Sequence, residues 1–195
     1  MYTLIFATNN QNKVQEIQSL IGADFKIIPL NEAGIDIDIP EPHHTFQENA
    51  NEKARTIFEM TKENCFSEDT GLEIESLNGA PGVKSARYAG DDRDFQANID
   101  KVLSELNGIE NRAAQFRTVI CLIWNETTYY FEGICKGHIA TVMQGEKGFG
   151  YDPIFIPEGD IRSFAQMTMA EKNKYSHRQK AVTQLFTFLR AQKFN

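Results

Sequence analysis

Several features that would place this 195-residue chain in a specialised class are missing from it. It has only three cysteines and no Cys-x-x-Cys pair, so neither a disulfide framework nor a cysteine metal site is indicated. No apolar run is long enough to cross a membrane. Its 20 basic residues are outnumbered by 27 acidic ones, which argues against a non-specific nucleic-acid binder.

The remaining composition is that of an ordinary globular protein, with 41% hydrophobic and 24% charged residues. This length favours one domain over residues 1–195. The segment Met1–Phe6 lacks a basic region, and its apolar stretch is too short for a signal peptide. Cys65, Cys121 and Cys135 lie among apolar or aromatic neighbours, so we expect buried free thiols and a cytoplasmic protein.

Hydrophobic periodicity predicts an α/β fold that begins with a strand, a helix and a second strand. Residues 3–7 form a continuous apolar run, a helical pattern follows from Asn12, and residues 26–30 are again strand-like. Further on, Ile35, Ile37 and Ile39 alternate with two aspartates, which predicts a partly exposed edge strand.

Later signals predict two capped helices, a hairpin and a final helix. Thr45 and Asp94 are candidate N-caps, and Glu48 stands at the capping-box position after Thr45. Residues 116–124 and 127–139 are rich in β-branched and aromatic residues and flank a two-residue turn, which predicts a hairpin. The last helix is expected to begin near Ser176. Because a hairpin breaks strict βαβ order, the predicted sheet is mixed.

The pair Glu68-Asp69 is the most informative feature of the chain. It follows the apolar residues Cys65 and Phe66 and precedes Gly71, so a strand is interpreted as ending there and delivering two carboxylates to a sheet edge. Carboxylates so placed suit Mg²⁺ binding or general-base catalysis. The alternative is an ordinary solvated turn.

A second candidate segment, Thr8–Lys13, lies between the first strand and the first helix. Backbone N–H groups at a helix start attract anions, and Lys13 adds a positive charge, so the segment is a candidate phosphate-binding loop. It is not a Walker A loop, because its glycines and its Lys-Ser/Thr ending are absent. The alternative is a simple N-capping turn.

A third candidate, residues 145–153, places Phe149 between two glycines and Asp152 before a proline. A nucleobase could stack on the exposed ring, and the extended backbone before proline could direct the carboxylate to the same ligand. The alternative is a turn whose aromatic side chains fill the core.

A fourth candidate, residues 171–178, gathers donors near the start of the last helix. Lys172 and Arg178 could contact phosphates or carbonyl oxygens, or they could belong to a solvated charged helix face.

Six blocks together resemble the inosine/xanthosine triphosphate pyrophosphatase family, whose members remove deaminated purine nucleotides. The first block carries Asn9 and Asn12 where glycines are common in the family. The blocks span nearly the whole chain in the family's order: Thr8-x-Asn10-x-x-Lys13, Thr45-Phe46-x-Glu48-Asn49-Ala50, Glu68-Asp69-Thr70-Gly71-Leu72, Gly79-Ala80-Pro81-Gly82-x-x-Ser85-Ala86-Arg87-Tyr88, Phe149-Gly150-Tyr151-Asp152-Pro153 and Ser176-His177-Arg178.

The resemblance implies an elongated α/β fold, with a long mixed sheet flanked by helices and a cleft between two lobes, usually as a homodimer. From the charge and the short apolar runs we expect neither nucleic-acid nor membrane partners. It implies Asp69 as general base and Glu41, Glu68 and Asp69 as Mg²⁺ ligands. It further implies a set of nucleotide-binding residues: Thr8, Asn9, Asn10, Gln11, Asn12, Lys13, Thr70, Phe149, Gly150, Tyr151, Asp152, Lys172, His177 and Arg178.

The implied reaction is hydrolysis of ITP, dITP or XTP to the monophosphate and pyrophosphate. We add the hypothesis that the acceptor Asp152 and the donor Arg178 select the N–H at position 1 and the carbonyl at position 6 of a deaminated purine. Two other functions remain open. One is a phosphohydrolase for other triphosphates, and the other is a non-catalytic nucleotide sensor.

Overall fold

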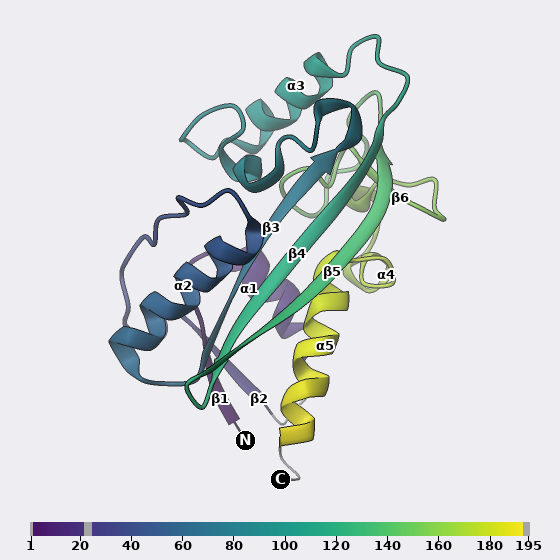
Figure 1. The fold of residues 1–195 in the computed structure, drawn as a ribbon. Helices are drawn as coiled ribbons and strands as arrows, with labels where there is room; N and C mark the ends of the chain where they lie inside the picture. The colour runs from purple at the N-terminus through teal and green to yellow at the C-terminus, as the bar shows by residue number, and fades with distance from the viewer. Residues whose placement is uncertain (1, 22–24, 193–195) are drawn as a thin grey trace. The chain divides into compact units, whose positions relative to one another are not determined.

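The computed structural model describes residues 2–21 and 25–192. Within them, six strands form one sheet in the order β2-β1-β3-β4-β5-β6 (Figure 1). Pairing is parallel between β1 and its neighbours β2 and β3 and antiparallel between β5 and β6, so the predicted α/β class with a mixed sheet is confirmed. The strands are β1 (Tyr2–Phe6), β2 (Phe25–Pro29), β3 (Cys65–Ile74), β4 (Ala113–Trp124), β5 (Thr127–Ile139) and β6 (Phe155–Pro157).

Two of the predicted helices begin at a capping side chain that the local sequence supplies. Thr45 caps α2 by accepting the Glu48 N–H at 3.2 Å, and Asp94 caps α3 by accepting the Gln96 N–H at 2.8 Å, as predicted. The described α-helices are α1 (Gln11–Gln18), α2 (Phe46–Thr61), α3 (Phe95–Glu105), α4 (Met169–Lys172) and α5 (His177–Ala191).

The predicted hairpin is confirmed between β4 and β5. Asn125 and Glu126 connect the strands with φ angles of 47° and 65°. Two successive positive φ angles are characteristic of the type I′ turn, whose twist matches that of paired strands.

The prediction of an edge strand around Ile35, Ile37 and Ile39 was wrong. Residues 35–42 have no regular structure, and the Ile35 N–H is bonded to the Leu30 carbonyl instead of to a neighbouring strand. The alternation has another cause, because all three isoleucines pack with the core cluster beside α2. Burial of alternate side chains therefore occurs here without a strand ladder.

The interpretation of Glu68-Asp69 as a strand end was also wrong. β3 continues through both carboxylates and through Gly71 to Ile74, so the acids lie in the middle of a ten-residue strand. Glu68 and Asp69 are only 2% and 5% exposed, which excludes the solvated turn as well.

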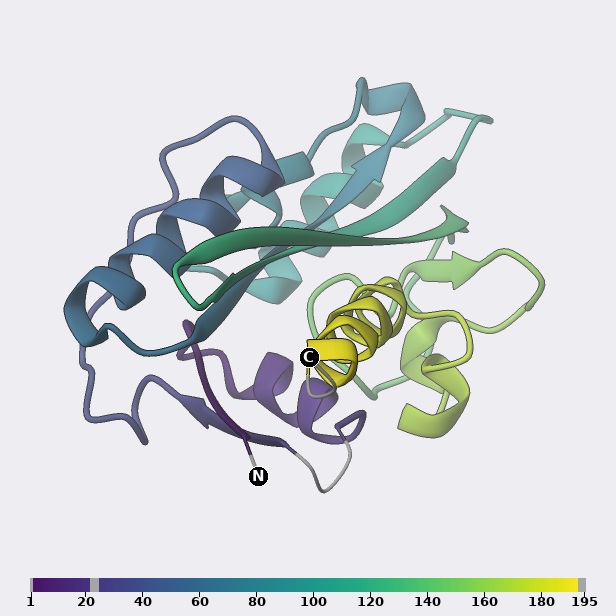
Figure 2. The same cartoon turned by 60° about the horizontal axis from the view of Figure 1, so that its bottom comes forward.

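The chain divides into two compact units. Unit 1 comprises Met1–Asp69, Thr118–Gly133 and Arg178–Asn195. Its strands carry apolar side chains on both faces, as alternation along a buried strand requires. One face packs against α1 and α5, and the opposite face packs against α2 (Figure 2).

Unit 2 comprises Thr70–Arg117 and Ile134–His177. Its core lies on one face of the sheet, where α3 and the segment following β5 cover residues such as Leu72, Phe116 and Ile139. Gly137 allows β6 to approach β5, because a Cβ atom there would lie 2.2 Å from the Ile156 carbonyl oxygen. Among the described residues, every helix is too short or too polar to span a bilayer.

All three cysteines are buried and free, as predicted. Burial raises the pKa of the Cys65 and Cys121 thiols to about 12, so on the order of one thiol in ten thousand is ionised at pH 8. We therefore expect native protein to resist a thiol-specific reagent at pH 8 at these two positions, whereas protein in 6 M guanidinium reacts at all three cysteines. Rapid labelling of Cys65 or Cys121 in the native state, located by peptide mass analysis, would contradict the described burial.

Candidate active site

Asp69 of β3 is held in unit 1 by two side chains from α2. Its Oδ2 accepts a hydrogen bond from Asn49 Nδ2 at 3.3 Å, and its Oδ1 lies 3.7 Å from Lys53 Nζ. Burial raises the pKa of Asp69 above its ordinary value, and the negative charge of Glu41 adds to this effect, while Lys53 opposes it. A carboxylate with a raised pKa is a stronger base than an ordinary one, which suits proton abstraction.

Lys53 is a site residue that the sequence reasoning missed. Its ammonium group lies between two carboxylates, bonded to Glu41 and 3.7 Å from Asp69, and the residue is 7% exposed. A signal was available, because Lys53 interrupts the apolar stripe that Ala50, Ala54 and Ile57 form on α2. A lysine on the buried side of a helix requires a negative partner, and Glu41 and Asp69 are its partners here.

The predicted metal ligands fall into two groups in this structure. Glu41 and Asp69 converge on Lys53, whereas Glu68 is bonded to Arg178 and Lys13. Among the described residues, no three His, Cys, Asp or Glu side chains lie together as a ready metal cluster. The donor chemistry of the first group nevertheless fits Mg²⁺, because two oxygen ligands already converge on one cation, the ammonium of Lys53.

Glu68 is part of a buried charge network in unit 1. Arg178 of α5 donates to both carboxylate oxygens of Glu68, from Nε to Oε2 and from Nη2 to Oε1 at 2.9 Å each, and it also bonds Glu16. Lys13 Nζ lies 3.2 Å from the same Glu68. Burial opposes the charge on Glu68, but Arg178 and Lys13 outweigh it and lower the pKa to about 2. Glu68 is therefore ionised throughout the physiological range.

The N-terminal loop of unit 1 adopts the capping arrangement. Asn10 Oδ1 accepts the N–H groups of Asn12 and Lys13 at 3.0 and 3.3 Å, and Thr8 Oγ1 accepts that of Asn10 at 3.1 Å. Asn9 Nδ2 donates to the Ile37 carbonyl, and Gln11 is exposed. These bonds order the loop at the start of α1. Phosphate binding by the segment stays a prediction.

Unit 2 brings three of the predicted nucleotide-binding residues together. Asp152 Oδ2 accepts a bond from Lys172 Nζ at 2.6 Å and another from the Phe149 N–H at 3.0 Å. Lys172 Nζ also lies 5.4 Å from the centre of the Phe149 ring. The turn requires glycine at position 148, where φ is 77° and a Cβ atom would lie 2.0 Å from Asp152 Oδ2.

The other predicted residues of unit 2 occupy different environments. Tyr151 belongs to the core, and its hydroxyl donates to the Ser85 carbonyl at 2.8 Å, which matches the alternative of an aromatic side chain that fills the core. His177 is buried with its ring stacked on Phe116 at 4.7 Å. Thr70 and Gly150 are half-buried. Substrate contacts by these four residues stay predictions.

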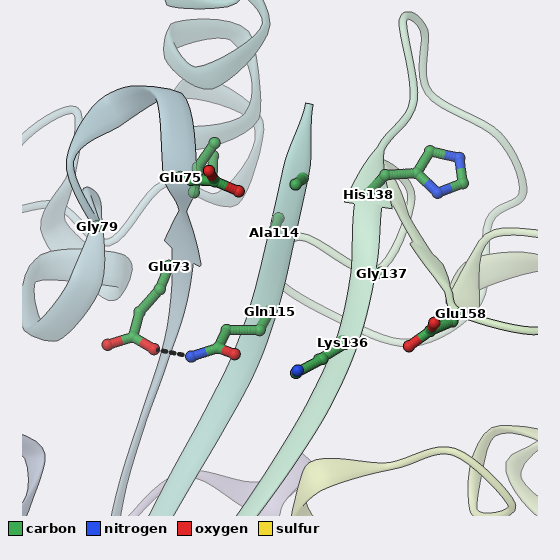
Figure 3. Close-up of a pocket in the computed structure, with 11 residues that line it drawn as sticks. Glu73, Glu75, Gly79, Ala114, Gln115, Lys136, Gly137, His138 and Glu158 are labelled. Carbon is green, nitrogen blue, oxygen red and sulfur yellow. Dashed lines mark hydrogen bonds between the residues drawn. The ribbon is translucent and has the colours of Figure 1, made fainter. Parts of the chain in front are cut away.

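A separate hollow of about 680 Å³ lies on the open face of the unit 2 sheet (Figure 3). Glu73, Gln115 and Lys136 project into it from β3, β4 and β5, and Gln115 donates to Glu73 at 2.7 Å. None of the nucleotide-binding, metal-binding or catalytic residues predicted from the sequence is among the described residues that line it. The hollow therefore lies outside the candidate site.

Comparisons with known proteins agree with the sequence blocks. The sequence model of the Ham1 family matches residues 4–188. A dITP/XTP pyrophosphatase of Flavobacterium psychrophilum is 49% identical over 96% of this chain and 98% of its own length, and one of Bacillus subtilis is 45% identical over 98% of both. The solved Ham1 protein of Staphylococcus aureus is 37% identical, with a TM-score of 0.89 over 97% of this chain and 99% of its own.

Proposed function

This chain belongs to the Ham1 family, and we propose that it hydrolyses deaminated purine nucleoside triphosphates to the monophosphate and pyrophosphate. The family membership confirms the resemblance that the six sequence blocks indicated. The observation that carries the mechanism is the buried carboxylate of Asp69, whose pKa is raised while it lies within reach of Lys53 and Asn49. The names of the relatives indicate hydrolysis of dITP and XTP.

In the proposed reaction, water attacks the α-phosphorus in line with the leaving pyrophosphate. Asp69 orients this water and accepts its proton, for which its raised pKa is suited. Negative charge on the phosphoryl oxygens is redistributed during the transfer, and fixed cations stabilise it. Lys13 and Lys53 are the cations of unit 1 that we assign to this task.

We further propose that Mg²⁺ assists the reaction, with Glu41 and Asp69 as ligands and Glu68 as a supporting carboxylate. When bound, the ion would neutralise phosphate charge and lower the pKa of a water molecule. Lys53 contributes by balancing the two carboxylates in the absence of other cations, which keeps Glu41 and Asp69 close together. The buried ion pair between Glu68 and Arg178 holds β3 and α5 together.

In unit 2, we propose that Phe149 stacks on the purine base and that Asp152 accepts the N–H at position 1. Adenine has no N–H at this position, and its N1 is an acceptor that would face the Asp152 carboxylate, so two acceptors would oppose each other, and such mismatches discriminate strongly. The ion pair with Lys172 Nζ, at 2.6 Å, fixes the position of the Asp152 carboxylate. Donation by Arg178 to the carbonyl oxygen at position 6 stays a prediction, and in unit 1 the guanidinium of Arg178 is bonded to Glu68 and Glu16.

The test is a substrate panel of ITP, dITP, XTP, ATP and GTP, with pyrophosphate release measured in Mg²⁺ and in chelator. We expect turnover of the three deaminated substrates with kcat/KM at least about a hundredfold above that of ATP, because an unpaired buried group rejects a substrate by such factors or more. Equal rates for all five, or release of orthophosphate, would favour a different phosphohydrolase. Binding without turnover would favour a nucleotide sensor.

The expected homodimer and cytoplasmic location belong to the same proposal. Sedimentation equilibrium of the purified chain measures the first, and fractionation of the source cells measures the second.

A further inference from the structure

We propose that Phe95 is a positioning residue for base recognition, which braces the ring of Phe149 and extends the apolar surface that receives the purine base. This inference rests on the proposed function, since it assigns Phe95 to the same base-binding segment. Phe95 is the first residue of α3, and its side chain is 41% exposed.

The first argument is the contact between the two rings, which lie in the same unit. Their centroids are 6.2 Å apart and their planes are tilted by 48°. This spacing is typical of a directly interacting aromatic pair, and it leaves no room for a base between the rings. Phe95 therefore supports Phe149 from the side. A base that stacks on Phe149 would also contact the edge of the Phe95 ring.

The second argument is that the backbone of Phe149 needs such support. Gly148 and Gly150 flank it with φ angles of 77° and 60°, so its two chain neighbours contribute no side chain that could pack against the half-buried ring. The Phe149 N–H is bonded to Asp152, and Lys172 approaches the ring as a cation. Phe95 adds an apolar contact to this ring.

The third argument is that packing in the core of unit 2 does not account for the Phe95 side chain. Phe95 is exposed, so it is not one of the buried residues that form the core cluster of unit 2. The neighbouring loop continues the exposed apolar surface with Val142 and Met143, and Gln96 of α3 contacts the Met143 sulfur at 3.3 Å. A ring that contributes little to the core and contacts Phe149 is explained by a ligand at Phe149.

The test compares the parent with Phe95→Ala, Phe95→Tyr and the control Ile109→Ala, which removes an equally exposed apolar side chain just beyond the other end of α3. We expect Phe95→Ala to raise KM for dITP about three- to tenfold, the range of an aromatic pair, with kcat within twofold. Phe95→Tyr should restore the parental KM, and Ile109→Ala should leave it unchanged. The Ki of inorganic triphosphate, which has no base, should stay the same in all variants.

Each other outcome overturns the inference in a recognisable way. An unchanged KM for Phe95→Ala in an active enzyme would remove the role of Phe95 and leave the proposed function intact. A parallel rise in the Ki of inorganic triphosphate would indicate general disruption. A change of sedimentation behaviour with an unchanged KM would assign the apolar surface to contacts between copies of the chain. An inactive parent would overturn the proposed function as well.

Discussion

Replacing Asp69 with asparagine should lower kcat for dITP hydrolysis by a factor of about 10² to 10⁴, the usual contribution of a general base. Asparagine has the same shape but cannot accept the proton from water. It also removes one of the two negative charges that converge on Lys53, so the local charge changes as well as the base. Turnover is measured by pyrophosphate release under saturating substrate, and nucleotide affinity is measured separately by calorimetry.

The matched control is Asp36→Asn, which neutralises an exposed aspartate of the same unit outside the site. It should leave kcat unchanged. If Asp69→Asn retained near-normal kcat while binding dITP, the assignment of the base would be wrong. Loss of binding in this variant together with loss of turnover would show that Asp69 acts mainly through substrate or metal affinity.

Replacing Arg178 with methionine should lower the free energy of unfolding at pH 7 by about 3–5 kcal/mol, the cost of breaking a buried ion pair. The variant leaves Glu68 and Glu16 buried without their main counter-charge, and both carboxylates are almost fully enclosed. Arg190→Met, at the exposed end of the same helix, is the control and should cost less than 1 kcal/mol. Urea unfolding in the presence of chelator measures both.

The pH dependence of this difference follows from the pKa of Glu68. The folded pKa of about 2 lies below the ordinary value of 4.5, so the stabilisation is fully present above pH 4.5 and is lost as the pH falls toward 2. The gap between the parent and Arg178→Met should therefore narrow between pH 4.5 and pH 2. A gap that stays constant over this range, or one below 1 kcal/mol at pH 7, would show that Arg178 does not stabilise ionised Glu68.

Local patterns predicted the helices and the hairpin well. Thr45, Asp94 and the Asn125-Glu126 pair act on residues within one turn of themselves, so their effect is legible in a short window of sequence. The false edge strand at Ile35, Ile37 and Ile39 had the right alternation, but no neighbouring strand pairs with these residues among the described ones. Alternation of apolar and polar residues indicates which side chains are buried. A segment forms a strand only when its backbone pairs with a neighbouring strand.

The pair Glu68-Asp69 shows the limit more sharply. By local criteria it reads as a polar turn before a glycine, yet both residues are buried in mid-strand. The partners that make this burial tolerable are distant in the chain: Arg178 follows Glu68 by 110 residues, and Asn49 precedes Asp69 by 20. Lys53 escaped notice for the same reason, because a buried lysine becomes intelligible only when its carboxylate partners are known.

The sequence by itself determined the family, the α/β class and the order of the chemical groups, since ordered motifs and capping residues are properties of the chain. The tertiary structure decided how those groups are charged and held. It assigned Glu68 to a buried network with Arg178, placed Lys53 between Glu41 and Asp69, and joined Lys172 to Asp152. Burial and pairing set a carboxylate's pKa, and both arise from residues that only folding brings together.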